Sequence, residues 1–299
     1  MNTLFASVST ALVLGAFPWN VSGDDQFTAE RDGKGRLVTA DNTGNTPPAT
    51  DPLGFVMKGG QLLGATVTSS ANENLGKIED LAVDLESGRI VEVILSLGDK
   101  LVALPPSVFA VGRDHHVLAN TDQETLKAAA PFDISHWEDS LRPAQVAKVY
   151  RDFDAVPYVS VVPLNAKPSA AEQLGHVERA SKLSAFNVKS REGVSIGKVN
   201  NLLIDLPAER VLQVVVSTGE FLGVHEALNY VPPAVLHYNA ERDGLTWDIS
   251  KETLSQAPRV QGNQWPGPSD RQQYTDAYNY YHIQPYFATN RVEVSSRRP

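Results

Sequence analysis

The sequence contains no cysteine. This absence excludes disulfide bonds, thiolate catalysis, cysteine-bound zinc and the lipidated cysteine of a bacterial lipoprotein. Basic residues are also few, since 26 Lys and Arg stand against 35 Asp and Glu, for a formal net charge of -9. Because affinity for nucleic acid rests largely on clustered Lys and Arg, this balance argues against nonspecific nucleic-acid binding.

The N-terminal segment lacks charge before Asp24, and its apolar stretch from Leu4 to Trp19 is shorter than the roughly 20 residues of a membrane-spanning helix. It resembles the hydrophobic region of a signal peptide, and 21–23 supply the small or β-branched residues that a signal peptidase reads. We therefore predict a signal peptide over 1–23 and a periplasmic or secreted mature protein with no integral membrane span. Because the segment also lacks a basic start, an uncleaved N-terminal membrane anchor is the alternative.

The chain has 299 residues, of which 42% are hydrophobic, so it is long enough for two domains with their own cores. Residues 24–58 are rich in Asp, Thr, Gly and Pro and lack hydrophobic periodicity. We interpret them as a flexible leader that precedes the first domain.

An internal repeat dominates the rest of the chain. Its first two matches share an offset of 121 positions, as from Gly76 to Gly197, and the third has an offset of 127. The second copy therefore carries six extra residues (127 minus 121) within 220–230, a loop between strands, where length changes are tolerated. The matched segments are 75–84 with 196–205, 89–98 with 210–219, and 105–106 with 232–233.

The repeated segments have the pattern of β-hairpins. Turn-forming residues at 84–88 and 205–209 separate two strands in each copy. One face of the second strand, which we expect to point inward, carries Val91, Val93 and Leu95 in one copy and Leu212, Val214 and Val216 in the other. Glu92 and Gln213 lie on the opposite face. Several short strands with no long helix between them favour a small antiparallel barrel.

The repeat continues beyond the strands at an offset of 128 positions, as from Trp137 to Trp265. In each copy an amphipathic stripe at helical spacing follows: Val146, Val149, Tyr150 and Phe153, then Tyr274, Ala277, Tyr278 and Tyr281. Pro143 and Pro268-Ser269-Asp270 suit helix starts. We expect each helix to pack on its own barrel. The alternative is an interaction surface of Tyr274, Tyr278, Tyr280, Tyr281, Tyr286 and Phe287.

The order and spacing of these motifs resemble the PRC-barrel domain, the module of the photosynthetic reaction centre H subunit and of a ribosome maturation factor. The motifs in the first copy are 62–67, 75–84, 88–91, 96–98 and 104–106, and in the second copy 217–224 resembles the glycine-rich loop of bacterial members. The resemblance covers roughly 62–120 and 183–249. It implies a barrel of about five or six strands that works by protein contact rather than by catalysis. It transfers no functional residues.

The sequence thus predicts a mainly β protein with two small antiparallel PRC-type β-barrels, each followed by a short aromatic-rich α-helical tail. The predicted segments are a signal peptide (1–23), a leader (24–58), repeat 1 with its tail (59–159), a linker (160–180), repeat 2 with its tail (181–287) and a C-terminal tail (288–299).

No group of residues has the pattern of a catalytic, cofactor or metal site. Asp84 and Asp205 stand beside Arg89 and Arg210, where we expect them to cap the hairpin turn and pair across it rather than to catalyse. The adjacent histidines His115-His116 point to opposite faces of a strand and do not suit one metal ion. The other histidines have no metal-ligand spacing, and no serine lies in a nucleophile elbow.

We therefore predict a non-enzymatic interaction or scaffold protein of the cell envelope, with no cofactor, an unidentified protein partner and a capacity for self-association. The alternative is a cytoplasmic ribosome- or RNA-associated factor, which needs a basic patch. The first repeat is instead acidic, with Glu79, Asp80, Asp84, Glu86 and Glu92. A third hypothesis, an enzyme, predicts a cleft between the barrels lined by polar residues of both copies.

Overall fold

The computed structural model describes residues 53–112, 114–157, 174–218, 227–260 and 271–287, and the backbone of three strands that precede them. Those strands are β1 (Pro18–Trp19), β2 (Phe27–Arg31) and β3 (Leu37–Asp41), which pair as a separate antiparallel sheet. The strands β2 and β3 lie in the segment that we expected to be a flexible leader. The proposed cleavage position, most of the predicted linker and the tail from 288 lie outside the described residues.

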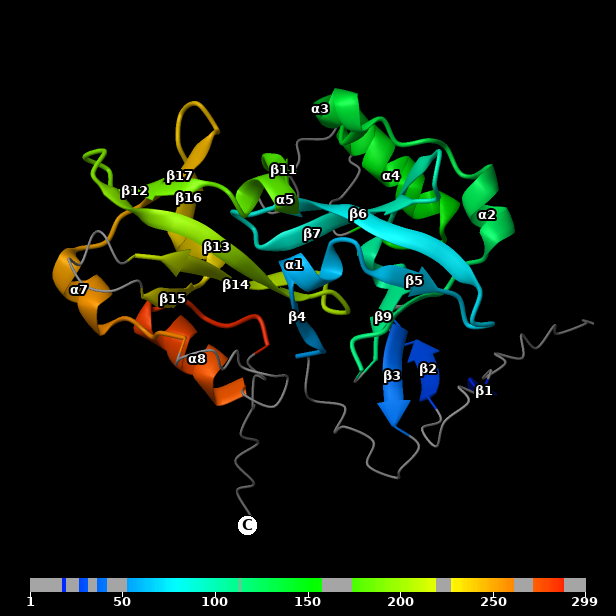
Figure 1. Ribbon diagram of the computed structural model, residues 1–299, viewed down its shortest axis with the longest axis horizontal. Helices are drawn as coiled ribbons and strands as arrows, with labels where there is room; N and C mark the ends of the chain where they lie inside the picture. The colour runs from blue at the N-terminus through cyan, green and yellow to red at the C-terminus, as the bar shows by residue number, and fades with distance from the viewer. Residues whose placement is uncertain are drawn as a thin grey trace, which may run out of the picture.

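The two repeats contain the same succession of elements from their first strand to α2 in repeat 1 and to α7 in repeat 2 (Figure 1). Repeat 1 comprises β4 (Val56–Lys58), α1 (Gly59–Leu62), β5 (Thr66–Thr68), β6 (Asn74–Asp84), β7 (Arg89–Ser96), β8 (Leu101–Leu104), η1 (Pro106–Val108), β9 (Phe109–Val111), β10 (Val117–Ala119), α2 (Gln123–Ala128), η2 (Ile134–His136), α3 (Trp137–Ser140) and α4 (Pro143–Asp152). Repeat 2 comprises β11 (Val177–Arg179), α5 (Ala180–Leu183), β12 (Asn187–Lys189), β13 (Ser195–Asp205), β14 (Arg210–Ser217), β15 (Leu228–Val231), η4 (Pro233–Val235), β16 (Leu236–Tyr238), β17 (Gly244–Trp247), α7 (Lys251–Gln256) and α8 (Arg271–Tyr280).

The prediction of a mainly β protein is confirmed, but the strands β4 to β17 form one 14-stranded curled sheet rather than two separate barrels. The two long hairpins, β6–β7 and β13–β14, are joined where β7 pairs with β14. The pairing is also not wholly antiparallel, because β5 pairs with β10, and β12 with β17, in the parallel sense. In each repeat the last strand thus pairs with the short strand that precedes the long hairpin, which curls the sheet.

The first strand of each repeat belongs to the sheet of the other repeat. Strand β4 pairs with β13 and places Met57 opposite Ile204, while β11 pairs with β6 and places Glu178 opposite Val83. Strands β4 and β11 lie just before 59 and 181, where the sequence predicted the two repeats to start. Three-residue strands are too short to show an alternating pattern, and their partners lie far away in the sequence, so neither strand had a local signal.

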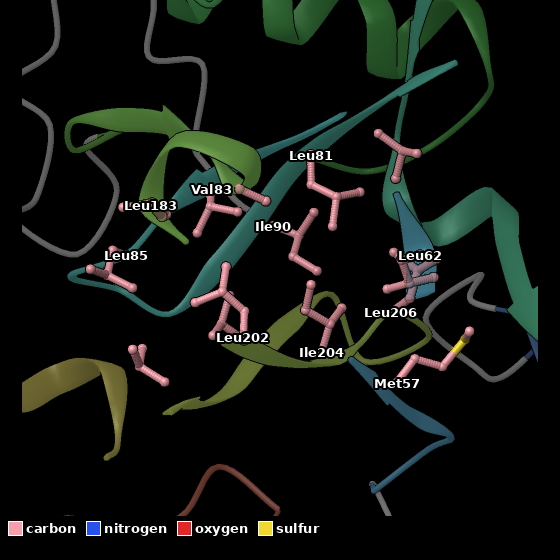
Figure 2. Packing of buried hydrophobic residues seen from close by; sticks show 14 of the residues in the cluster. Met57, Leu62, Leu81, Val83, Leu85, Ile90, Leu183, Leu202, Ile204 and Leu206 are labelled. Atoms are coloured by element: carbon pink, nitrogen blue, oxygen red, sulfur yellow. The ribbon is translucent and has the colours of Figure 1, made fainter. Parts of the chain in front are cut away.

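One hydrophobic core is shared by the two repeats. Figure 2 shows Leu81, Val83 and Ile90 of the first hairpin facing Leu202 and Ile204 of the second. The short helices α1 and α5 close this core, with Leu62 and Leu183 fully buried in it. Because apolar side chains of both repeats are removed from water by the same contacts, hydrophobic burial stabilises the pair of repeats as one unit.

A β-bulge in each hairpin changes which residues face this core. Ala82 pairs with Glu92 while Val83 pairs with Ile90, so Val91 is an extra residue in β7, and Leu212 is its counterpart in β14. The prediction that Val91 and Leu212 share a face with the rest of the inward set is therefore wrong. A bulge interrupts the period of two, and these two residues face outward, into two smaller clusters.

Helices α4 and α8 cover these two outer clusters. Tyr150 of α4 donates a hydrogen bond of 2.8 Å to the carbonyl of Val91, and Tyr278 of α8 donates one of 2.9 Å to the carbonyl of Leu212. Each tyrosine hydroxyl thus bonds to a bulge residue, where the ladder between the strands is interrupted. Among the described residues, no helix is both long and apolar enough to span a membrane.

Candidate functional site

The exchanged strands and the hairpin ends that receive them form a polar site between the repeats. The segments 54–58 and 175–179 share the pattern Gly-x-Val-x-basic and lie at the repeat offset of 121 positions. In both, the valine is buried and the strand leads directly into a short helix. Each segment therefore fills an equivalent position on the opposite repeat.

Asp84 and Asp205 receive the glycines of these segments. Gly175 donates its backbone N–H to Asp84 at 3.3 Å, and Gly54 donates to Asp205 at 2.9 Å. A Cβ atom at Gly54 would lie 2.6 Å from the Asp205 carboxylate, closer than side chains approach in folded proteins. The two carboxylates also accept the backbone N–H of Ser87 and Ala208, so both cap their hairpin turns as the turn pattern predicted.

A second contact of the exchange differs between the repeats. The buried carboxylate of Asp80 accepts the backbone N–H of Ser181 at 3.1 Å and its hydroxyl at 2.5 Å. At the equivalent position of repeat 2, Asn201 faces Gly60, which has no side chain to offer. The exchange is therefore symmetric in its backbone but not in its side-chain chemistry.

Arg89 and Arg210 stand directly opposite each other where the two hairpins meet. The guanidinium of Arg89 lies 3.9 Å from the Glu209 carboxylate, and Arg210 donates to the carbonyl of Ser87 at 2.9 Å. Both arginines thus reach across to the other repeat. Burial, and then the nearby Arg89, lower the pKa of Arg210. The two arginines that match in the repeat thus form contacts between the repeats.

A cleft of about 450 Å³ lies between the repeats, lined by Trp137 and Glu138 from repeat 1 and by polar residues of repeat 2. It is the kind of cleft that the enzyme hypothesis predicts. Its groups bond mainly to one another: Glu178 lies 2.5 Å from Lys182, and the Trp137 indole donates to the carbonyl of Val177 at 2.9 Å. The Arg179 guanidinium lies 5.1 Å from the centre of the Trp137 ring. These contacts hold β11 in place.

A larger cavity, of about 810 Å³, opens at the far end of the first hairpin and is lined by Lys77, Lys100 and Lys127 among others. Lys100 donates to three backbone carbonyls at the end of α2, those of Leu126, Lys127 and Ala129. The ammonium group therefore neutralises the negative end of this helix. The Lys100 side chain, which has no match in the second repeat, is thus used within the fold.

The paired histidines lie at the surface beside one acidic residue. His115 and His116 are exposed, and the nearest carboxylate, Asp114, lies 4.0 Å from the Nε2 atom of His116. Among the described residues, no three His, Cys, Asp or Glu side chains are grouped so that they hold a metal ion.

Glu92 and Gln213 occupy equivalent positions of β7 and β14, and sequence reasoning assigned them only to an outer face. Both side chains are fully buried, and among the described residues neither makes a side-chain hydrogen bond. Burial raises the pKa of Glu92 to about 8. The carboxyl group of Glu92 is therefore neutral in the folded protein at and below neutral pH.

The tyrosines of α8 divide between the core and polar contacts. Tyr274 and Tyr278 are buried, whereas Tyr280 and Tyr281 are half-buried, and Tyr280 donates to the carbonyl of Thr253. Tyr286 donates a hydrogen bond of 3.0 Å to Asp205, the carboxylate that receives strand β4. The aromatic stripe thus lies against the protein's own sheet within the described residues.

Two repeats of one small curled β-module, tied together by reciprocal exchange, define a tandem β-module protein. The family model of the PRC-barrel domain matches residues 56–126 and 175–254, which together make up just over half of the sequence. The chain therefore belongs to the PRC-barrel domain family. A comparison with curated proteins found no match. The two matches begin at or just before the exchanged strands, in agreement with the boundaries seen in the fold.

Proposed function

We propose that this chain is a non-enzymatic protein-interaction or scaffold protein built from two PRC-barrel modules, each covered by its aromatic helix, and that it acts in the cell envelope. The proposal rests on one observation: the polar groups between the repeats make contacts within the chain. In the cleft lined by Trp137, the charged groups of Glu178, Lys182 and Arg179 bond to other parts of the chain. A site for catalysis instead needs reactive groups that are directed at a substrate.

The envelope location rests on the N-terminal sequence alone. The apolar stretch that ends near Trp19, followed by small residues and then Asp24, has the pattern of a secretory signal. We expect the mature protein to begin at Asp24 and to occur in the periplasmic or secreted fraction. An unprocessed N-terminus in the membrane fraction would support the anchored alternative, and one in the cytoplasm would support the ribosome-associated alternative.

The experiment uses the full chain with a C-terminal tag, expressed in its own host. The mature N-terminus is determined by mass spectrometry, and the tagged protein is then captured from the envelope fraction after chemical cross-linking. We expect one or more envelope proteins at near-stoichiometric amounts. A Gly197→Leu variant, in which the strands cannot approach each other, serves as the misfolded control because a partner that needs the fold will not bind to it. Capture of nothing above this control, with a monomeric protein at high concentration, would contradict the proposal.

The enzyme alternative is tested on the same preparation. Trp137→Ala opens the cleft between the repeats, whereas Val194→Ala changes an exposed side chain far from it. If the protein binds its partner through the modules, Gly197→Leu loses partner capture. Trp137→Ala then changes no small-molecule turnover. A turnover that the wild type shows and Trp137→Ala loses would favour the enzyme.

A further inference from the structure

The hairpin end of each repeat is an acceptor for a short β-strand. Strands β6 and β13 each have 11 residues and pair on one side with β7 or β14. On the other side, only their first parts pair with a strand of their own repeat, β5 or β12. Their last three residues, 82–84 and 203–205, pair with the strand that the other repeat supplies. Without that strand, each hairpin would expose an unpaired sheet edge, which is a template for another β-strand.

The acceptor recognises its strand through two groups. The aspartate at the hairpin end favours glycine, since a Cβ at Gly175 would lie 3.0 Å from the Asp84 carboxylate and one at Gly54 would lie 2.6 Å from that of Asp205, so a larger residue would displace the carboxylate. Two residues further on, Val177 and Val56 are buried on the outer side of the sheet, under α4 and α8. A strand with the pattern Gly-x-Val therefore fits either acceptor.

The contact at Asp80 makes the two acceptors different. Asp80 is 3% exposed, and the donors that Ser181 contributes are its backbone N–H and its hydroxyl. If repeat 1 received a strand like β4, glycine would replace Ser181, and the hydroxyl that bonds to this buried carboxylate would be lost. Loss of a hydrogen bond to a buried charged group is strongly unfavourable. Repeat 1 therefore selects the strand of repeat 2 over its own.

We propose that the same strand exchange also occurs between molecules, and that the partner is a second copy of the chain. Repeat 1 of one copy would receive β11 from repeat 2 of the other copy, and would supply β4 in return. Such an association repeats every contact of the exchange already present within the chain, so concentration and the tether between repeats decide the balance between monomer and dimer. This inference rests on the proposed function, protein interaction, and names a second copy of the chain as one partner.

The test uses Arg89 and Arg210, which face each other across the contact between repeats. Ile90 donates its N–H to the carbonyl of Glu209, and Val211 donates to that of Gly88, both at 3.0 Å. These flanking bonds identify the pair 89 and 210 as a non-hydrogen-bonded antiparallel pair, in which the Cα atoms lie closest and a disulfide is well accommodated. Because the chain has no cysteine, any disulfide arises only from the introduced residues.

The first measurement establishes the contact within one chain. The double variant Arg89→Cys/Arg210→Cys is oxidised with glutathione disulfide at low protein concentration. We expect an intrachain disulfide in most molecules, seen as a faster-migrating monomer on a non-reducing gel. Failure to form this bond would overturn the inference, since the contact on which it depends would then be absent in solution.

The second measurement asks whether copies exchange. Arg89→Cys and Arg210→Cys single variants carrying tags of different size are unfolded, mixed, refolded at rising concentration and oxidised. We expect the mixed 89–210 dimer to exceed the like dimers, 89–89 and 210–210, by at least about fivefold. Val194→Cys, at an exposed position away from the contact, measures random disulfide formation. No mixed dimer above this background at any concentration would overturn the proposal, whereas the capture of other envelope proteins would still stand.

The third measurement tests whether Asp80 and Ser181 determine which strand each repeat receives. In the Asp80→Asn/Ser181→Gly background, the acceptor and donor of repeat 1 and repeat 2 become chemically alike. We expect like dimers to rise toward the amount of the mixed dimer, and Ser181→Ala with Asp80 intact, which removes the same hydroxyl, to shift the dimers in the same direction while lowering total stability. An unchanged preference in the first background would show that Asp80 and Ser181 do not determine the pairing.

Discussion

The two repeats share a backbone but differ at one buried position, and this difference is instructive. Glu92 in β7 and Gln213 in β14 occupy the same place, and both are fully buried without side-chain hydrogen bonds among the described residues. The glutamine is uncharged at every pH, whereas burial disfavours the ionised form of the glutamate. Repeat 2 is therefore a natural control for the effect of an ionisable group on repeat 1.

The largest expected effect is a loss of stability as the pH rises. Burial raises the pKa of Glu92 to about 8 from its ordinary value of 4.5, so the unfolded chain ionises first and is favoured as the pH increases. The stability contribution is fully present below pH 4.5 and is lost between 4.5 and about 8. Its size is on the order of 5 kcal/mol, from about 1.4 kcal/mol per pKa unit. Urea unfolding between pH 4 and 9, followed by tryptophan fluorescence, measures this slope.

Glu92→Gln removes the difference between the repeats, and Gln213→Glu introduces it into repeat 2. We expect Glu92→Gln to flatten the pH dependence and to stabilise the protein at pH 8 while changing little at pH 4. Gln213→Glu should steepen the same slope. An unaltered slope in Glu92→Gln would show that other groups govern the pH dependence.

The next largest effect is expected at a glycine that the two repeats share. A Cβ at Gly197 would lie 1.7 Å from the carbonyl oxygen of Ser217, and one at Gly76 would lie 2.2 Å from that of Ser96. Because the obstacle is backbone, the strands must separate, and we expect Gly197→Ala to destabilise the protein by about 3 kcal/mol. Gly60→Ala is the matched control, since its nearest neighbour would be 3.8 Å away. Thermal unfolding of the two variants compares them directly, and equal melting temperatures would contradict the close approach.

The smallest expected effect concerns the tyrosines that bond to the bulges. Tyr278→Phe and Tyr150→Phe each remove one hydroxyl and leave a buried carbonyl without that donor. We expect a loss of about 1 kcal/mol for each, nearly equal in the two repeats. Chemical unfolding measures both, with Tyr280→Phe, whose hydroxyl lies at a more exposed position, as the milder comparison. A large effect in only one repeat would show that the two helices are held differently.

Much of the fold follows from local sequence patterns. The offset of 121 positions and the alternating residues of β7 and β14 predicted the two long hairpins, and helical spacing predicted α4 and α8. The bulges at Val91 and Leu212 were not predictable, because apolar residues on both sides of Glu92 and of Gln213 give the alternation of a regular strand. The acceptor role of Asp84 and Asp205 was also missed, since each partner glycine lies in the other repeat.

By itself, the sequence determined that one β-module occurs twice, that cysteine chemistry is absent, and where the hairpins turn, since these properties depend on residues close together in the chain. The tertiary structure alone decided which hairpin receives which first strand. Strands β4 and β11 carry nearly the same pattern, so either hairpin would satisfy their backbone groups. Only the three-dimensional contacts, such as that between Asp80 and Ser181, distinguish one pairing from the other.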